Sequence, residues 1–155
     1  MSLPIKDSDF GANGKLRGGY REAAKMLQGL DPEMREKVIH FIEVRDPETA
    51  KEVRLNLVLW EDLQFLTAPM VAELVRAVNT DKLALGLRIS SDELQETIFS
   101  AVSEALQEEL KVYINGGPVK KSEVVGAQHY VLTILRDLID DGKISIDRDK
   151  DPQMV

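Results

Sequence analysis

The sequence predicts an all-α protein with about nine helices. Two observations support this class. Apolar residues recur at spacings of three and four through most of the 155 residues, as they do on the buried face of a helix. Helix boundary signals are also clear: Asp-Pro-Glu begins at Asp31 and again at Asp46, and a Gly-Gly-Pro break at 116–118 precedes a long helical pattern.

The composition is that of a protein with a substantial hydrophobic core and an acidic surface. Hydrophobic residues make up 43% of the chain, and 27 acids against 20 bases give a formal net charge of −7. Because positive charge is what binds a phosphate backbone, we expect no nucleic acid partner. Without cysteine there is no disulfide and no thiolate metal site, which fits a reducing, cytoplasmic location. No apolar run reaches the roughly 20 residues of a membrane span, so we expect no direct membrane insertion.

Residues 1–17 are predicted to be a flexible lead-in. They combine Pro, Asp, Asn and Gly with few apolar side chains, which is typical of poorly ordered segments. Gly14-Lys15 invites comparison with a phosphate-binding loop. However, no Gly lies five residues before Gly14, and Leu16 stands where that loop has Ser or Thr, so we exclude this site.

Three helical patterns follow in the first half of the chain. The first begins at Gly19, and the next two begin with Asp31 and Asp46 as N-caps, each with Pro in the first turn. Their apolar stripes are Tyr20, Ala23, Ala24, Leu27 and Leu30; Met34, Val38, Phe41 and Ile42; and Ala50, Val53 and Leu57. Two helices of similar length with the same start signal suggest stacked helical hairpins of the armadillo or HEAT kind.

The run Leu55–Trp60 is the most apolar segment of the first half. Its length would fit a buried strand, but helical patterns flank it and no partner strand is evident. We therefore interpret it as the end of the third helix and a connection that Trp60 anchors by packing.

The second half is predicted to hold further helices with clear ends. Ser90 and Glu93 form a capping box for one of them. The apolar face of this helix is predicted to continue through Leu94, Ile98, Val102 and Leu106. The closing helix runs from the N-cap candidate Ser122 to Asp141, and Gly142 ends it. Its buried face is predicted to be Val124, either Gln128 or Val131, Leu132, Leu135 and Leu138.

No constellation of residues indicates an active site. His40 and His129 are far apart in the sequence, and a lone helical His is more often a packing residue than a ligand. Neighbouring carboxylates such as Glu108-Glu109 point about 100° apart on a helix, so they do not share a proton. We predict that the chain is not an enzyme and has no catalytic residue, metal site or cofactor.

The end of the chain is rich in aspartate. Asp147, Asp149 and Asp151 imitate the opening of a calcium loop, but Pro152 stands where that loop needs Gly. We interpret residues 148–155 as a solvated acidic tail.

The distribution of charge is the strongest functional signal. Between Ile89 and Leu110 there are six acids and no Lys or Arg: Asp92, Glu93, Glu96, Glu104, Glu108 and Glu109. One interpretation is a solvated helix face, and the other is a surface that steers a basic partner. Basic residues flank this run on both sides, namely Arg88, Lys111, Lys120 and Lys121. The alternation of sign suits a polar docking surface.

Residues 18–147 resemble the C-terminal half of FliG, the bacterial flagellar motor switch family. The motifs that carry the resemblance are, in order, Gly18-Gly19 with Ala23-Ala24 and Leu27; Leu30-Asp31; Asp46-Pro47-Glu48; Glu61-Asp62-Leu63; Leu74-Val75-Arg76-Ala77-Val78 with Leu83-Ala84-Leu85; Ile98-Phe99; and Gly117-Pro118-Val119 with Val124, Ala127-Gln128 and Gly142-Lys143-Ile144-Ser145-Ile146.

The resemblance implies an armadillo-like helical bundle over residues 18–60, followed by a C-terminal helical domain over residues 61–147. It also implies a hinge between them, where the family has Met-Phe-x-Phe. The hinge residues are then Leu57, Val58, Leu59 and Trp60.

The resemblance further implies a rotor component of the flagellar motor switch, which takes part in rotation and switching through protein–protein assembly. The expected partners are FliM, a MotA-type stator protein and other copies of the chain, stacked through their armadillo units. The expected location is the cytoplasmic face of the inner membrane, in the flagellar basal body. The partner-docking charges are Arg88, Glu104, Glu108, Glu109, Lys111, Lys120 and Lys121.

The charged residues depart from the family pattern at several positions. Arg88 matches a family Lys and Lys120 matches a family Arg, whereas Ala105 stands where the family has Arg. The family also has an acidic pair on this helix. In this sequence the nearest acidic pair is Glu108-Glu109, which is shifted in register from the family's positions. These departures favour an alternative function, a stand-alone FliG-like helical adaptor with a non-flagellar protein partner.

Overall fold

The structure is a computed structural model that describes residues 3–147. These residues form α-helices and two short 3₁₀ helices without any strand, which confirms the predicted all-α class. The chain divides into unit 1, Met1–Val58, and unit 2, Leu59–Val155. This division falls earlier than the expected boundary after residue 60. The predicted acidic tail, residues 148–155, lies outside the described residues.

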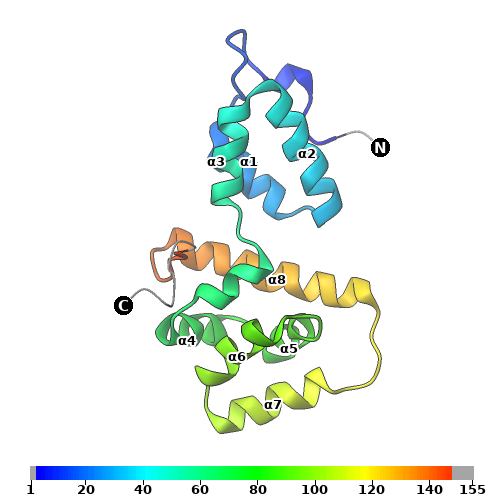
Figure 1. The fold of residues 1–155 in the computed structure, drawn as a ribbon, viewed down its shortest axis with the longest axis vertical. Helices are drawn as coiled ribbons and strands as arrows, with labels where there is room; N and C mark the ends of the chain where they lie inside the picture. Colours follow the sequence, from blue (N-terminus) through cyan, green and yellow to red (C-terminus); the bar gives the residue numbers. More distant parts are fainter. Residues whose placement is uncertain (1–2, 148–155) are drawn as a thin grey trace. The chain divides into compact units, whose positions relative to one another are not determined.

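Figure 1 shows the elements in chain order. They are η1 (Asp7–Asp9), α1 (Gly19–Gln28), α2 (Pro32–Arg45), α3 (Pro47–Asn56), η2 (Trp60–Phe65), α4 (Ala68–Ala77), α5 (Thr80–Leu87), α6 (Asp92–Ser100), α7 (Glu104–Ile114) and α8 (Lys121–Asp140). No helix within residues 3–147 has both the length and the apolar composition needed to cross a bilayer.

Unit 1 is a three-helix bundle in which α3 packs against both α1 and α2. Both predicted N-caps are present: a side-chain oxygen of Asp31 accepts from the Met34 N–H, and Asp46 accepts from the Thr49 N–H. The predicted stripes supply most of the core, which contains Ala23, Ala24, Leu27, Val38, Ile39, Ile42, Ala50, Val53 and Leu57. Local capping and helical periodicity therefore account for this bundle.

The segment before α1 is folded onto the bundle, so the prediction of a poorly ordered lead-in is wrong for residues 3–17, which we call the strap. Ile5 and Leu16 are both buried in the core of unit 1, and Phe10 packs against it. A short bridge between Phe10 and Leu16 closes the strap on itself. Ile5 and Leu16 therefore belong to the core that α1, α2 and α3 form.

Unit 2 is organised around α5, which packs against α8 on one side and α7 on the other. Figure 1 shows α8 along one edge of this unit and α7 along the opposite edge, with α4 to α6 between them. Its fully buried side chains include Leu63, Val71, Leu74, Leu83, Leu87, Leu94, Ile98, Leu110, Val131 and Leu135. The predicted stripe of α8 is confirmed, with Val131 rather than Gln128 as the buried residue.

Two predicted helix starts are wrong, one by one residue and the other by two. The N-cap of α6 is Ser91, whose hydroxyl accepts from the Leu94 N–H at 3.2 Å, and Ser90 belongs to the preceding turn. Helix α8 begins at Lys121, and its N-cap is Lys120 rather than Ser122. The N-cap of α8 makes no side-chain hydrogen bond, so its start carries no local capping signal.

The helix predicted to run from Leu94 through Leu106 is in fact two helices. Helix α6 ends at Ser100, and α7 starts after the N-cap Ser103, whose hydroxyl accepts from the Leu106 N–H. The apolar spacing continues from Leu94 to Leu106, but the N-cap at Ser103 marks the start of a separate helix.

The predicted end of α8 at Gly142 is confirmed in detail. Gly142 has φ 76°, a left-handed conformation that favours Gly. Its N–H donates to the Ile139 carbonyl, and the Lys143 N–H donates to the Leu138 carbonyl. This pair of bonds is the Schellman arrangement, which satisfies the last free carbonyls of a helix.

Candidate functional site

Helix α7 presents a charged outward surface in unit 2. Its inner side is fixed by Leu110, which is 0% exposed, and by Gln107, whose side-chain amide donates to the Phe99 carbonyl at 2.8 Å. The opposite side carries Glu104, Glu108 and Glu109, all exposed, which we call the acidic ridge. Residues four apart lie on one side of a helix, so Glu104 and Glu108 project in nearly the same direction.

The acidic ridge is only weakly neutralised. Lys111 lies 3.7 Å from Glu108, in an exposed pair of the kind that contributes little to stability. Among the described residues, Glu104 and Glu109 take part in no ion pair. The remaining acids of the run, Asp92, Glu93 and Glu96, are exposed on α6. The surface therefore keeps a net negative charge.

The ridge ends in apolar side chains. Val112 follows Glu108 by one helical turn and is 71% exposed, and Tyr113 follows Glu109 in the same way. Ala105 is also exposed on this side of α7. The outer side of α7 thus changes from acidic to apolar along its length.

Arg88, the first predicted docking charge, is engaged in a structural contact. Its Nη2 and Nε donate to the Tyr113 carbonyl at 2.7 and 3.2 Å, and its Nη1 donates to the Gly117 carbonyl at 2.7 Å. A Cβ on Gly116 would lie 2.9 Å from this guanidinium. Arg88 therefore fastens the end of α7, where a positive charge also meets the negative end of the helix dipole.

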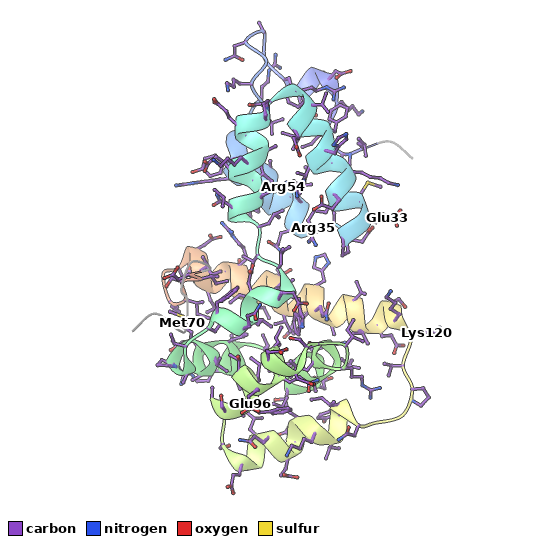
Figure 2. The ribbon with its side chains drawn as sticks, in the orientation of Figure 1. Glu33, Arg35, Arg54, Met70, Glu96 and Lys120 are labelled. Carbon is purple, nitrogen blue, oxygen red and sulfur yellow. The ribbon has the colours of Figure 1, made fainter. Side chains whose placement is uncertain are left out.

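Lys120 and Lys121 are exposed at the start of α8. Figure 2 shows Lys120 at this position and Glu96 on α6, so the charges of this surface come from different elements of unit 2. Within the part of the chain that is described, neither lysine forms an ion pair. Cations at a helix N-terminus are electrostatically unfavourable for the helix itself.

The end of α5 is the junction that supports this surface, and sequence reasoning did not identify it. The Trp60 indole N–H donates to the Ser90 hydroxyl at 2.6 Å, and that hydroxyl donates to the Gly86 carbonyl at 3.0 Å. The Gln128 amide donates to the same carbonyl at 2.9 Å. A Cβ on Gly86 would lie 2.6 Å from the Trp60 ring. A Gly inside a helical pattern was the available signal for such a close approach.

The predicted hinge residues belong to different units. In unit 1, Leu57 and Val58 are buried, and the side-chain amide of Gln28 bonds both the N–H and the carbonyl of Val58. In unit 2, the Leu59 N–H donates to the Asp62 carboxylate at 2.8 Å, and Trp60 is packed at the end of α5.

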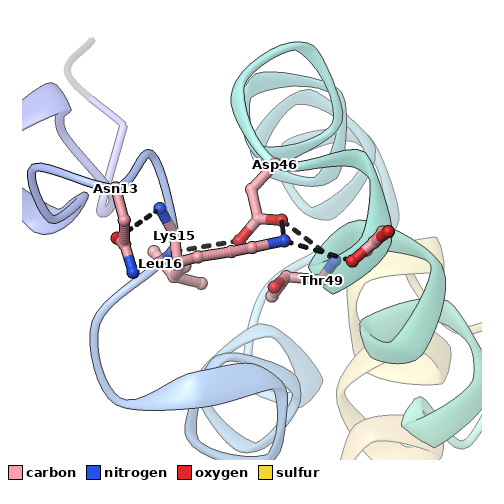
Figure 3. Close-up of polar contacts among 6 residues, drawn as sticks. Asn13, Lys15, Leu16, Asp46 and Thr49 are labelled. Atoms are coloured by element: carbon pink, nitrogen blue, oxygen red, sulfur yellow. Dashed lines mark hydrogen bonds and ion pairs between the residues drawn. The ribbon is translucent and has the colours of Figure 1, made fainter.

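Asp46 holds the corner between α2 and α3 in unit 1 (Figure 3). Its carboxylate accepts from the Leu16 N–H at 3.0 Å and from the Thr49 N–H at 3.3 Å, and Lys15 lies 3.5 Å away. Burial alone would raise the pKa of Asp46, but the hydrogen bonds from Thr49 and Leu16 and the charge of Lys15 outweigh it and lower that pKa.

The histidines and carboxylates of the described residues do not gather at one place. Within residues 3–147, no three His, Asp or Glu side chains are grouped so as to hold a metal ion. His40 lies on α2 in unit 1 and His129 on α8 in unit 2. One hollow of unit 1, with a volume of ≈ 270 Å³, lies between the strap and α1.

Sequence comparison gives close agreement with one family. The sequence model of the FliG C-terminal domain matches residues 40–146. The flagellar motor switch protein FliG of Thermotoga maritima is 34% identical over 135 residues, which cover 84% of this chain and 39% of that protein. FliG of Bacillus subtilis is 30% identical over 132 residues, with coverages of 84% and 39%. The chain thus spans about two fifths of the length of these curated relatives.

Structure comparison agrees with the sequence. Residues 86–343 of FliG from H. pylori have a TM-score of 0.63 at 23% identity, covering 84% of this chain and 62% of that one, and they show the likeness of fold. Full-length FliG from Aquifex aeolicus has a TM-score of 0.52 at 31% identity, with coverages of 84% and 41%. On the family match over most of its length, this chain belongs to the FliG C-terminal domain family.

Proposed function

We propose that the chain is a rotor component of a FliG-type flagellar motor switch that acts through protein–protein assembly. Its curated relatives are named flagellar motor switch proteins, which supports this role. In this proposal the chain docks to a MotA-type stator protein, binds FliM, and self-associates by stacking of unit 1. It works at the cytoplasmic face of the inner membrane, in the flagellar basal body.

The acidic ridge of α7 is the observation that carries the proposal. Three exposed carboxylates on one side of a rigid helix create a negative field that raises the encounter rate with a basic surface. Lys120 and Lys121 add a positive patch that brings no benefit to α8 itself. Arg88 contributes by fixing the end of α7, so that the ridge is presented in one orientation.

Gene deletion followed by complementation tests the role. Deletion should abolish or stop flagellar rotation, and the wild-type gene should restore it. Complementation with the double variant Glu108→Lys and Glu109→Lys should leave cells poorly motile, with partial recovery when the stator's basic residues are reversed in sign. The double variant Asp81→Lys and Asp137→Lys, which makes the same charge change on exposed residues of α5 and α8, serves as the control. Normal swimming of the deletion strain would refute the motor role.

A stand-alone helical adaptor with a non-flagellar protein partner is the second candidate. It is favoured by Ala105, which leaves the outer side of α7 without the family's positive charge, and by the engagement of Arg88 with two backbone carbonyls. Affinity capture separates the two candidates. Recovery of FliM or a MotA-type protein supports the motor component, and recovery of neither, together with normal swimming of the deletion strain, supports the adaptor.

A further inference from the structure

The strap, residues 3–17, is a small module with its own hydrogen bonds. Within it, the Gly11 N–H donates to the Lys15 carbonyl at 2.8 Å, and the Arg17 N–H donates to the Asp9 carbonyl at 2.8 Å. The Lys6 N–H donates to the Asp9 carboxylate, also at 2.8 Å. Because these bonds lie inside the strap, it keeps them wherever it binds.

The strap contacts the bundle of unit 1 through three apolar side chains. Ile5 and Leu16 enter the core and are 5% and 8% exposed, and Phe10 lies 6.2 Å from Phe41 of α2, measured between ring centroids. Burial of aliphatic side chains of this size is the main source of such binding.

The polar contacts of the strap are matched in charge and meet one corner of the bundle. Asp7 accepts from the Arg45 guanidinium at 2.6 Å, while Lys15 donates to Glu48 at 3.1 Å. The Leu16 N–H donates to Asp46, the N-cap of α3 (Figure 3). The corner between α2 and α3 thus binds both an acidic residue, Asp7, and a basic residue, Lys15, of the strap.

The strap is joined to α1 by a link of two glycines. Gly18 and Gly19 have φ values of 84° and 76°, so both adopt a left-handed conformation that other residues rarely take. A Cβ on Gly19 would meet nothing within 4 Å. Only this link holds the strap to its own bundle rather than to an identical one.

We propose that two copies of the chain exchange straps, so that the strap of each copy binds the bundle of unit 1 in the other and a dimer forms. Every contact that the strap makes within one chain is available in a second copy, and reciprocal exchange of an identical element is a low-cost route to a dimer. The proposal rests on unit 1 alone and is independent of the motor role.

Cross-linking between tagged copies tests the exchange directly. The chain has no cysteine, so the double variant Lys15→Cys and Glu48→Cys carries the only two thiols, one on the strap and one on its binding site. Two versions with tags of different size are mixed at high concentration and treated with a short bismaleimide. Exchange predicts a cross-linked product that contains both tags. Cross-links confined to single chains at every concentration would overturn the proposal.

Four further variants keep the test specific. Lys25→Cys with Glu48→Cys places the first thiol on α1 instead of the strap and should give no mixed product. Gly19→Ala strains the closed link, so it should raise the dimer association constant by about fivefold for each link relieved, measured by light scattering. Gly126→Ala, on α8 of unit 2, should leave it unchanged. A dimer that persists after Leu16→Asp, or a dimer fraction unaffected by Gly19→Ala, would refute strap exchange.

Discussion

The side-chain amide of Gln28 bonds both backbone groups of Val58: its Nε2 donates to the Val58 carbonyl at 2.6 Å, and its Oε1 accepts from the Val58 N–H at 2.9 Å. Gln28 is 7% exposed and Val58 is buried, so these groups have little access to water. The extended chain that leaves α3 is thus held to the end of α1 by a side chain that takes the place of a strand partner.

Replacement of Gln28 by Leu should loosen this connection. The variant leaves a buried N–H and a buried carbonyl without partners, and each such group costs about 1–3 kcal/mol. We expect the Val58 amide to lose hydrogen-exchange protection and unit 1 to unfold at a lower urea concentration. Gln64→Leu, an exposed position of η2, should change neither. Unaltered protection of the Val58 amide in Gln28→Leu would mean that the two hydrogen bonds from Gln28 do not stabilise this connection.

Gly86 should not tolerate a methyl group. In Gly86→Ala the new Cβ would lie 2.6 and 2.8 Å from two carbons of the Trp60 ring, and overpacking of this kind costs about 1–3 kcal/mol. We expect a lower thermal midpoint for unit 2, reported by the fluorescence of Trp60, the sole tryptophan. Gly126→Ala on the exposed side of α8 should instead stabilise unit 2, by about 0.5–1 kcal/mol. Equal effects of the two substitutions would contradict this explanation.

The stability of unit 1 should depend on the ionisation of Asp46. Its folded-state pKa lies below the ordinary value, so its contribution to stability is fully present above about pH 4 and is lost as the pH falls through the folded-state pKa. Asp46→Asn should remove this pH-dependent contribution and lower stability at neutral pH. Urea unfolding followed by circular dichroism across the acidic range measures both effects. Glu22→Gln, which removes a carboxylate from an exposed residue of α1, is the matched control.

Arg88 should act through geometry as well as through charge. Arg88→Lys keeps the positive charge, but a single ammonium cannot reproduce the forked contact with the Tyr113 and Gly117 carbonyls. We expect residues 115–120 to become more mobile, so that trypsin cleaves after Lys120 and Lys121 several-fold faster. Arg76→Lys, at an exposed ion pair with Glu73 on α4, provides the control. Equal cleavage rates in both variants would indicate that Arg88 does not fasten this segment.

Signals that depend on neighbours in the sequence were read correctly. Asp31 and Asp46 cap the helices that they were predicted to cap, and Gly142 ends α8, because the atoms that decide these features lie within a few residues of one another. The apolar stripes also identified most of the core, although Ile39 was missed.

The errors arise where distant parts of the chain decide the outcome. Ser90 looks like a cap from sequence, but the Trp60 indole engages its hydroxyl, and Ser91 caps α6 instead. The strap is polar in composition, yet its Ile5 and Leu16 are buried in the core of unit 1, which lies outside the strap itself. The role of Arg88 depends on backbone carbonyls, which no pattern of side chains reveals.

The packing of α7 also has a mechanical consequence. Within the described residues its principal packing partner is α5, and Arg88 ties the end of α7 to the last turn of that helix. A lateral load on the acidic ridge therefore reaches the rest of unit 2 mainly through α5. At Gly86 the load meets the Trp60 ring and the Gln128 amide, which brace the helix against η2 and α8. Gly86 is therefore one point at which a force applied to α7 passes from α5 to η2 and α8.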